Sequence, residues 1–139
     1  MKIVSNLVLL FTLLVLPACE KGNIPVINDS DNLLGCWINP VVVDTIWQYE
    51  RSASFKEDEG GIYFKSGHEF VERMNSGWCG TPPITYANFD GTWTRNDSFL
   101  NITVGFWGGT VDYEWKIISV DNDKLMIYRV KDTYHFQEE

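Results

Sequence analysis

The sequence lacks the features that mark most catalytic and metal-binding sites. It contains only 2 histidines and 3 cysteines, and none of these is spaced as CxxC or HxxxH, so a zinc site is not expected. It also has no G-x-S-x-G turn, no phosphate-binding loop and no histidine beside a plausible nucleophile. We therefore expect a protein that is not an enzyme and that uses no metal or cofactor.

Positive charge is also scarce. The chain has 11 Lys and Arg against 19 Asp and Glu, a formal net charge of −8. Loss of residues 1–18 would remove Lys2 and leave 10 basic side chains, a net charge of −9. Phosphates and anionic lipid headgroups repel such a surface. We expect no nucleic-acid partner and no attachment to a membrane by charge.

Long hydrophobic runs are missing too, because the apolar stretch Leu7–Leu16 is about half the ~20 residues that span a hydrocarbon core. It follows a single basic residue and precedes the small residue Ala18, as in a cleaved secretory signal peptide. Leu16-Pro17-Ala18-Cys19 resembles the lipobox of bacterial lipoproteins, in which the cysteine is acylated and becomes the mature N-terminus. The alternative is an ordinary secreted protein that is cut nearby, with Cys19 incidental.

The lipobox resemblance divides the chain into three parts. It implies a signal peptide over residues 1–18, a lipidated Cys19 that begins a flexible linker over residues 19–32, and one domain over residues 33–139. The Gly, Asn, Asp, Ser and Pro content before residue 33 is typical of a linker. Because two acyl chains make a stable anchor, we expect a lipoprotein of the bacterial cell envelope, at the outer membrane.

Two cysteines remain in the domain, Cys36 and Cys79. In an exported chain an even pair predicts a disulfide, which would stabilise the fold by roughly 4 kcal/mol on the chain-entropy model. The alternative is two buried free thiols.

The domain has no sustained apolar stripe at helical spacing, so little helix is expected. Of the chain's 6 Trp, 6 Tyr and 8 Phe, all but one Phe lie in the domain, and such residues suit pleated, half-buried strands. Apolar and charged residues alternate in Val111–Ile117, and Gly108-Gly109 predicts a hairpin turn before it. Eight or nine such strands predict an all-β antiparallel barrel or sandwich. The short links favour up-and-down order, with one long irregular loop over residues 76–83.

Gly35-Cys36-Trp37, at the start of the first predicted strand, matches the G-x-W that opens the lipocalin barrel. With the lipobox, the loop after Ser76 and Gly91-Thr92-Trp93, the domain resembles the lipocalin-like domain family of small bacterial lipoproteins. The resemblance implies a small barrel that binds an apolar or amphipathic ligand, and a closed end where Trp37 packs under Arg129. The alternative is a solvated Arg129 and a Trp37 that is simply part of the core.

An immunoglobulin-like sandwich is the rival fold. Cys36, Trp47 and Cys79 follow the Cys…Trp…Cys order of that fold. The interval to Cys79 is short, however, and Gly77 stands where the tyrosine corner would require Tyr. The barrel is therefore favoured.

Three functional hypotheses follow. The first is a small hydrophobic ligand inside the barrel, lined by inward aromatics whose alternative role is to pack a dry core: Phe64, Phe70, Trp93 and Trp115. The second is an interaction module of an envelope assembly that uses the loop around Trp78. The third, an enzyme, lacks a site; for example Glu69 and Glu72 fall on opposite faces of a strand and cannot act as a pair. Asp44-Thr45-Ile46 resembles a bacterial O-glycosylation acceptor, although an unmodified Thr45 is favoured.

Overall fold

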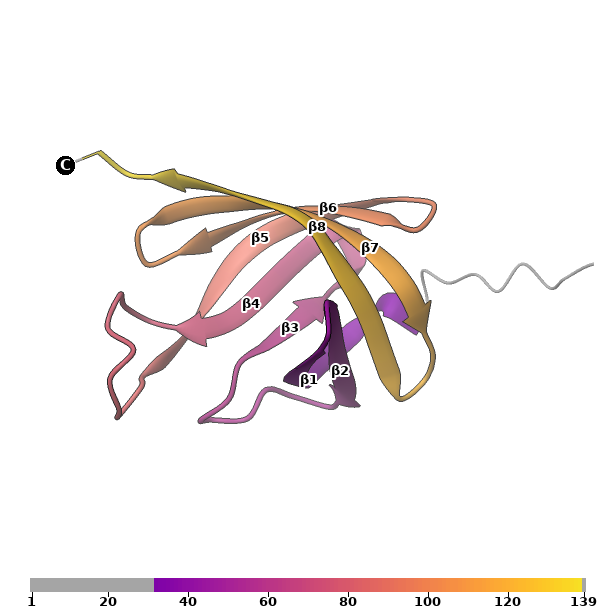
Figure 1. Cartoon of the computed structure of the whole chain (residues 1–139), viewed down its shortest axis with the longest axis horizontal. Helices are drawn as coiled ribbons and strands as arrows, with labels where there is room; N and C mark the ends of the chain where they lie inside the picture. Colours follow the sequence, from indigo (N-terminus) through magenta and orange to yellow (C-terminus); the bar gives the residue numbers. More distant parts are fainter. Residues whose placement is uncertain (1–31, 139) are drawn as a thin grey trace, which may run out of the picture.

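The computed structural model describes residues 32–138, and eight strands within it form a closed antiparallel barrel (Figure 1). The predicted signal peptide, Cys19 and the linker up to residue 31 lie outside the described residues. The strands are β1 (Gly35–Val43), β2 (Ile46–Ser52), β3 (Gly61–Phe64), β4 (Glu69–Asn75), β5 (Tyr86–Asn96), β6 (Phe99–Phe106), β7 (Gly109–Val120) and β8 (Lys124–Phe136).

The predicted all-β, up-and-down barrel is confirmed. From β3 to β8 each strand pairs with the next one along the chain, and β2 pairs with β8 to close the barrel. One connection departs from this order, because β1 lies between β2 and β3. The β2–β3 link, residues 53–60, therefore passes from one side of β1 to the other.

Alternating sequence explains the strands. In β7, Val111, Tyr113 and Trp115 are buried while Asp112 between them is exposed. The same period in β6 buries one residue in two. In both strands one face packs on the core and the other meets solvent, as antiparallel sheets allow.

The last strand, β8, changes its register against β7 along its length. A single strand continues through a bulge, where Glu114 pairs with Lys131 but the next residue, Trp115, pairs with Arg129. A bulge adds one residue to one strand and so changes which side chains face inward beyond it. Arg129 and Asp132 thereby come to the same, inner face.

The barrel has two unlike ends. At the closed end (right in Figure 1) the helical turn at Asn32–Leu33 meets the β7–β8 turn, residues 121–123. At the open end (left) lie the loop over residues 76–85 and the C-terminal end of β8. The described chain thus enters the barrel at its closed end.

The core runs along the inside of the barrel. Its residues share inward positions on the strands and include Leu33, Trp37, Phe64, Phe70, Trp93, Leu100, Trp115, Leu125 and Ile127. The whole core cluster lies between Leu33 and Ile127. Since the barrel closes around a core drawn from its own strands, it is a self-contained folding unit.

The predicted Cys36–Cys79 disulfide is absent from this structure, in which both thiols are free. Cys36 is buried near the start of β1, whereas Cys79 is exposed in the loop between β4 and β5. A disulfide needs Cα atoms within about 7 Å of each other. These two cysteines stand at opposite ends of the barrel, so the prediction is corrected on that ground.

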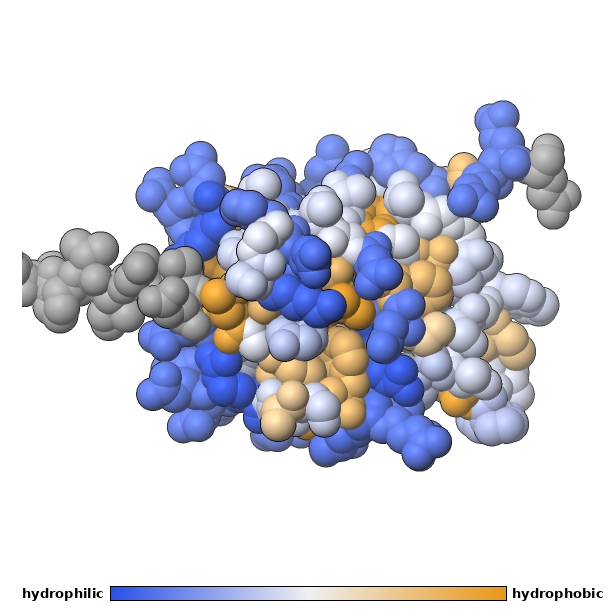
Figure 2. Space-filling view, turned by 180° about the vertical axis from the view of Figure 1, so that it is seen from behind, coloured by the Kyte–Doolittle hydropathy of each residue, from blue (hydrophilic) through white to orange (hydrophobic). Residues whose placement is uncertain are grey.

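The outer surface mixes apolar and charged groups. Figure 2, which shows the face opposite to that of Figure 1, has apolar patches set among hydrophilic ones. The most exposed large apolar side chain is Trp78, of which 81% is exposed. Among residues 32–138 no helix has the length and hydropathy needed to cross a bilayer.

Candidate functional site

The closed end is sealed by a tryptophan and an arginine that face each other across β1 and β2. Trp37 pairs with Arg51 in the strand register, and the Arg51 guanidinium carbon lies 4.1 Å from the centroid of the Trp37 ring. The indole Nε1 donates a hydrogen bond to the Leu33 carbonyl at 2.9 Å. A cation over an indole is stabilising when it is shielded from water.

Arg51 also binds the backbone around it. Its guanidinium donates hydrogen bonds to carbonyls of the entering chain and of the β7–β8 turn: Asn32, Leu34, Asp121 and Asn122. A Cβ at Gly35, whose φ is +130°, would come within 2.6 Å of the arginine Nη1. The glycine of the G-x-W motif therefore leaves room for Arg51.

The arginine over Trp37 is thus not Arg129, and that prediction was wrong. β8 begins beside β2 with Lys124 opposite Glu50, near the closed end. Arg129 lies five residues further along, or about 17 Å at the usual rise of a strand. It points into the barrel from the other half, toward the open end.

A cavity of about 400 Å³ occupies the open end of the barrel. Its apolar wall includes Trp47, Ile62, Met74, Ile84 and Tyr86. Its polar wall includes the side chains of Tyr49, Glu72, Tyr113, Arg129 and Tyr134. The volume is in the range of small-molecule sites, which combine an apolar lining with a few polar groups.

Glu72 is the buried carboxyl of this cavity. Only 8% of the residue is exposed, and its Oε2 accepts a hydrogen bond from the Tyr113 hydroxyl at 3.0 Å. Burial raises the pKa of Glu72 to about 7, although Arg129 and the Tyr113 hydrogen bond oppose the rise. Glu72 therefore exchanges its proton near neutrality.

Arg129 stands beside Glu72 with aromatic rings around it. Its guanidinium carbon lies 3.7 Å from the ring centroid of Trp47, 5.0 Å from that of Trp115 and 5.4 Å from that of Tyr113. Its acceptors are distant: the Tyr49 hydroxyl at 3.5 Å and an Asp132 carboxylate oxygen at 3.7 Å. Charge-assisted hydrogen bonds are normally about 2.7–2.9 Å long.

Several polar atoms around this cluster have no partner. The buried Nε of Arg129, Oδ1 of Asp132 and Nε1 of Trp115 make no hydrogen bond. Buried polar groups are nearly always satisfied, so each exception requires an explanation. Burial also raises the pKa of Tyr49, to about 12, and that of Tyr113, for which the Glu72 charge adds to the rise. Both phenols are therefore neutral donors at physiological pH.

The four aromatics predicted to line a ligand site lie elsewhere. Phe64 packs against Phe70 and Trp93, with ring centroids 5.1 and 5.4 Å away, and Phe70 packs against Trp115 at 6.2 Å. All four belong to the core cluster, and none of them lines the open-end cavity. The structure thus gives them the alternative role, that of packing the core.

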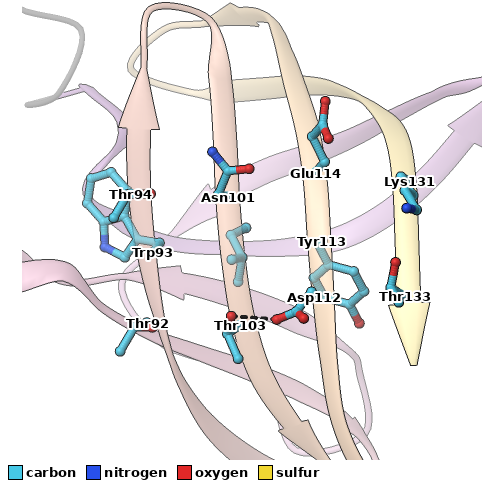
Figure 3. A pocket seen from close by; sticks show the side chains of 11 residues that line it. Thr92, Trp93, Thr94, Asn101, Thr103, Asp112, Tyr113, Glu114, Lys131 and Thr133 are labelled. Atoms are coloured by element: carbon cyan, nitrogen blue, oxygen red, sulfur yellow. Dashed lines mark hydrogen bonds between the residues drawn. The ribbon is translucent and has the colours of Figure 1, made fainter. Parts of the chain in front are cut away.

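A second hollow, of about 390 Å³, crosses the outer face of β5–β8 (Figure 3). One row of neighbouring side chains runs Thr92, Thr103, Asp112 and Thr133, and the next runs Thr94, Asn101, Glu114 and Lys131. The Thr103 hydroxyl donates to Asp112 at 2.6 Å, and His135 Nε2 lies 2.8 Å from the same carboxylate. These hydrogen bonds lower the pKa of Asp112. The Asp112 carboxylate of this hollow thus has its partners at the surface, in Thr103 and His135.

Sequence reasoning missed both Glu72 and Arg51 as site residues. The signal was present, because Phe70, Glu72 and Met74 alternate on β4 and so face the same side. A charged residue in line with two apolar ones on the core face is an exception that marks a buried polar site. Arg51 is the same kind of exception, in line with Trp47 on β2.

Neither a metal site nor a relative adds to this description. Over residues 32–138 no group of three or more His, Cys, Asp or Glu is placed to hold a metal ion. Compared with protein-family models, with curated proteins and with solved structures, the chain matches none of them.

Proposed function

We propose that this protein is a lipid-anchored binding protein of the bacterial cell envelope. Its lipocalin-like barrel holds a small amphipathic molecule in the open-end cavity and performs no reaction on it. The observation that carries the proposal is the burial of Glu72 and Arg129 in a cavity of about 400 Å³. A stable barrel does not need charges there, since apolar residues of similar volume often serve stability as well or better.

The two ends of the barrel support this division of labour. Arg51 and Trp37 seal the end at which the described chain enters. An acylated Cys19 would therefore hold the barrel by its closed end, and the cavity would lie at the end away from the anchor. The anchor itself rests on the lipobox resemblance and on the short apolar run before it.

Binding rather than catalysis is favoured by the neighbours of Glu72. The Tyr113 phenol is held neutral because burial raises its pKa. The other neighbour, Arg129, remains protonated in proteins and cannot act as a base. A neutral phenol and a guanidinium can orient a polar ligand group, but neither is an activated nucleophile.

The test is a melting experiment on the barrel, residues 24–139, with and without an envelope lipid extract. A ligand that binds the folded state raises the melting temperature by mass action, by about 10 °C at a hundredfold excess over Kd for a domain of this size. Intrinsic tryptophan fluorescence should change too, because Trp47 lines the cavity. No change with any lipid, fatty acid or sterol would contradict the binding proposal.

The anchor has its own test. Mass spectrometry of the mature protein should find Cys19 as the first residue, with a diacylglyceryl group and an amide-linked acyl chain or free amine. A mature chain that begins elsewhere, or carries no lipid, would contradict the anchor and leave the binding proposal standing.

An interaction module is the second candidate, and one observation favours it. Trp78 is 81% exposed in the loop over residues 76–85, and exposed tryptophans are frequent energetic centres of protein interfaces. If Trp78→Ala abolished co-purification with an envelope partner while no amphiphile shifted the melting temperature, the interaction module would replace the binding protein.

A further inference from the structure

The open-end cavity holds a cation, Arg129, whose donors are only partly used. Arg129 is stacked on Trp47 at 3.7 Å, which fixes the plane of its guanidinium. Its Nε has no partner, and the Tyr49 hydroxyl and the Asp132 carboxylate stand at 3.5 and 3.7 Å from its terminal nitrogens. A guanidinium is a fork of five donors suited to an oxyanion. Arg129 therefore has free capacity for an acidic group.

The same cavity holds the group that would answer a new negative charge. Glu72 lines the cavity together with Arg129, and its carboxylate accepts a hydrogen bond from the Tyr113 hydroxyl at 3.0 Å. The titratable and charged groups that face Glu72 come from three other strands: Tyr49 from β2, Tyr113 from β7, and Arg129, Asp132 and Tyr134 from β8. Arg129 is the cation that acts on Glu72, and it has two carboxyls as neighbours. Arg73 also lines the cavity, but its guanidinium donates hydrogen bonds to the Lys56 and Glu57 carbonyls and to the Asn88 side chain.

We propose that the cavity takes an anionic amphiphile with its acidic group against Arg129, and that Glu72 takes up a proton from solvent as the anion binds. This inference rests on the proposed binding function and names the ligand class for that site. The anion replaces the Glu72 carboxylate as the negative charge beside Arg129. Near neutral pH the free-energy cost of protonating Glu72 is small, because its pKa is already about 7.

A cationic ligand fits the same geometry less well. Aromatic faces attract cations, but the faces of Trp47, Tyr113 and Trp115 are already within 3.7–5.4 Å of the Arg129 guanidinium. A ligand cation would have to lie against Arg129, where like charges repel in a low dielectric. The geometry therefore selects an acidic group.

The rest of the ligand would lie against the apolar wall. Ile62, Met74, Ile84 and Tyr86 share the cavity with the charged cluster. Ile84 belongs to the loop before β5 and Tyr86 begins that strand, so this part of the apolar wall stands at the rim, whereas Ile62 is buried deeper in the barrel. A molecule with an acidic end and an apolar body would enter with its acidic end first.

The experiment uses two matched fluorescent probes on the barrel, residues 24–139. One is 1-anilinonaphthalene-8-sulfonate, whose sulfonate stays charged, and the other is N-phenyl-1-naphthylamine, the same aromatic body without the sulfonate. We expect the sulfonate to bind about tenfold more tightly at about pH 6 than at about pH 8, since binding is linked to one proton. The uncharged probe should bind equally at both pH values. Decanoate should displace the sulfonate more effectively than decanol does.

Two variants assign the effect to its residues. Glu72→Gln should bind the sulfonate at both pH values with the affinity of the wild type at low pH, so the pH dependence disappears. Arg129→Met should lose at least tenfold in sulfonate affinity and keep its affinity for the uncharged probe. Exposed neighbours on the same strands provide the controls: Glu69→Gln on β4 and Lys131→Met on β8 should behave as the wild type.

The outcomes separate the two proposals. If neither probe binds, the binding function itself fails. If the uncharged probe binds but the sulfonate does not, or if sulfonate binding ignores pH and Arg129→Met, the cavity binds a ligand and the anionic inference is overturned. Should Arg129→Met not fold, the Glu72→Gln variant alone tests the inference. If its sulfonate affinity changed with pH as much as that of the wild type, the inference would be overturned.

Discussion

The two ends of the barrel contain the same pair of residues in different surroundings. At the closed end Arg51 lies 4.1 Å from the ring centroid of Trp37, and at the open end Arg129 lies 3.7 Å from that of Trp47. Arg51 donates to four backbone carbonyls, of which the Leu34 oxygen lies at 2.8 Å. Arg129 has an unpartnered Nε and no acceptor nearer than 3.5 Å.

The difference teaches that the residue pair alone does not define a role. Where backbone acceptors surround the guanidinium, the pair holds three segments of chain together. Where side chains stand back from it, the pair leaves unused donors in a cavity, next to a carboxyl that burial keeps close to neutral. Structural burial satisfies polar groups, whereas binding sites leave some of them for the ligand.

The largest expected effect is on the closed end. Arg51→Met removes four hydrogen bonds to backbone carbonyls, and two of the acceptors it leaves, the Asn32 and Leu34 carbonyls, are partly buried. Bonds to a charged donor are worth about 1.5–3 kcal/mol each and unsatisfied acceptors add to the loss. We expect the free energy of unfolding to fall by about 4 kcal/mol, measured by urea denaturation.

Arg129→Met is the matched comparison for Arg51→Met. Because Arg129 makes only long polar contacts and Glu72, with a pKa of about 7, can become neutral when the cation is removed, the variant should lower the free energy of unfolding at about pH 6 by about 1 kcal/mol, the size of one net hydrogen bond. Equal losses for the two variants would show that both arginines serve structure, and the contrast between the ends would be wrong.

The next effect in size is a pH dependence of stability that comes from Glu72. Its pKa is about 7 in the folded protein against a usual 4.5, so between these values the folded protein holds the proton more tightly than the unfolded chain does. Stability should therefore fall as the pH rises from about 4.5 to about 7 and level off above that range. The fall is on the order of 3 kcal/mol at about 1.4 kcal/mol per pKa unit.

Glu72→Gln should remove this fall, whereas the exposed Glu69→Gln should preserve it. The measurement is the urea denaturation midpoint of the wild type and of both variants at a series of pH values. An unchanged slope in Glu72→Gln would mean that Glu72 is solvated and that the open end holds no near-neutral carboxyl.

Local sequence patterns were enough to predict the fold. Alternation in β6 and β7, together with the turns beside them, requires no knowledge of distant contacts. The strand order was harder, because nothing in residues 53–60 shows that the β2–β3 link crosses β1. The disulfide prediction failed for the same reason, since the distance between Cys36 and Cys79 depends on which end of the barrel each residue reaches.

The site could be predicted only in part. Gly35 and Trp37 of the G-x-W motif predicted the closed end, but the resemblance predicted Arg129 over Trp37 where the structure has Arg51. Arg51 lies opposite Trp37 because β1 and β2 pair in that register. The register is visible in the structure, but the amino-acid composition does not indicate it. At the open end the bulge before Lys131 turns Asp132 inward, and a bulge has no clear signal in one sequence. Glu72 was within reach, as the one charge in the inward row of β4.

The two thiols extend the comparison of the ends. Cys36 is buried near the closed end, and burial raises the pKa of its thiol. Cys79 is exposed in the open-end loop, and hydrogen bonds from Thr81 lower the pKa of its thiol. A maleimide should therefore label Cys79 at least about a hundredfold faster than Cys36 in the native barrel, as followed by mass spectrometry. Loss of both thiols without added reductant would instead indicate the disulfide.

The smallest expected effect on stability is at Trp78, the most exposed large apolar side chain of residues 32–138. Because 81% of Trp78 is exposed, Trp78→Ala should change the free energy of unfolding by less than about 0.5 kcal/mol. Trp47→Ala is the contrast, since its ring packs on Arg129 and Tyr49, and its removal should lower both stability and probe binding. If Trp78→Ala weakened binding of the uncharged probe as much as Trp47→Ala did, the 76–85 loop would contact the ligand. The ligand site would then extend beyond the cavity to include that loop.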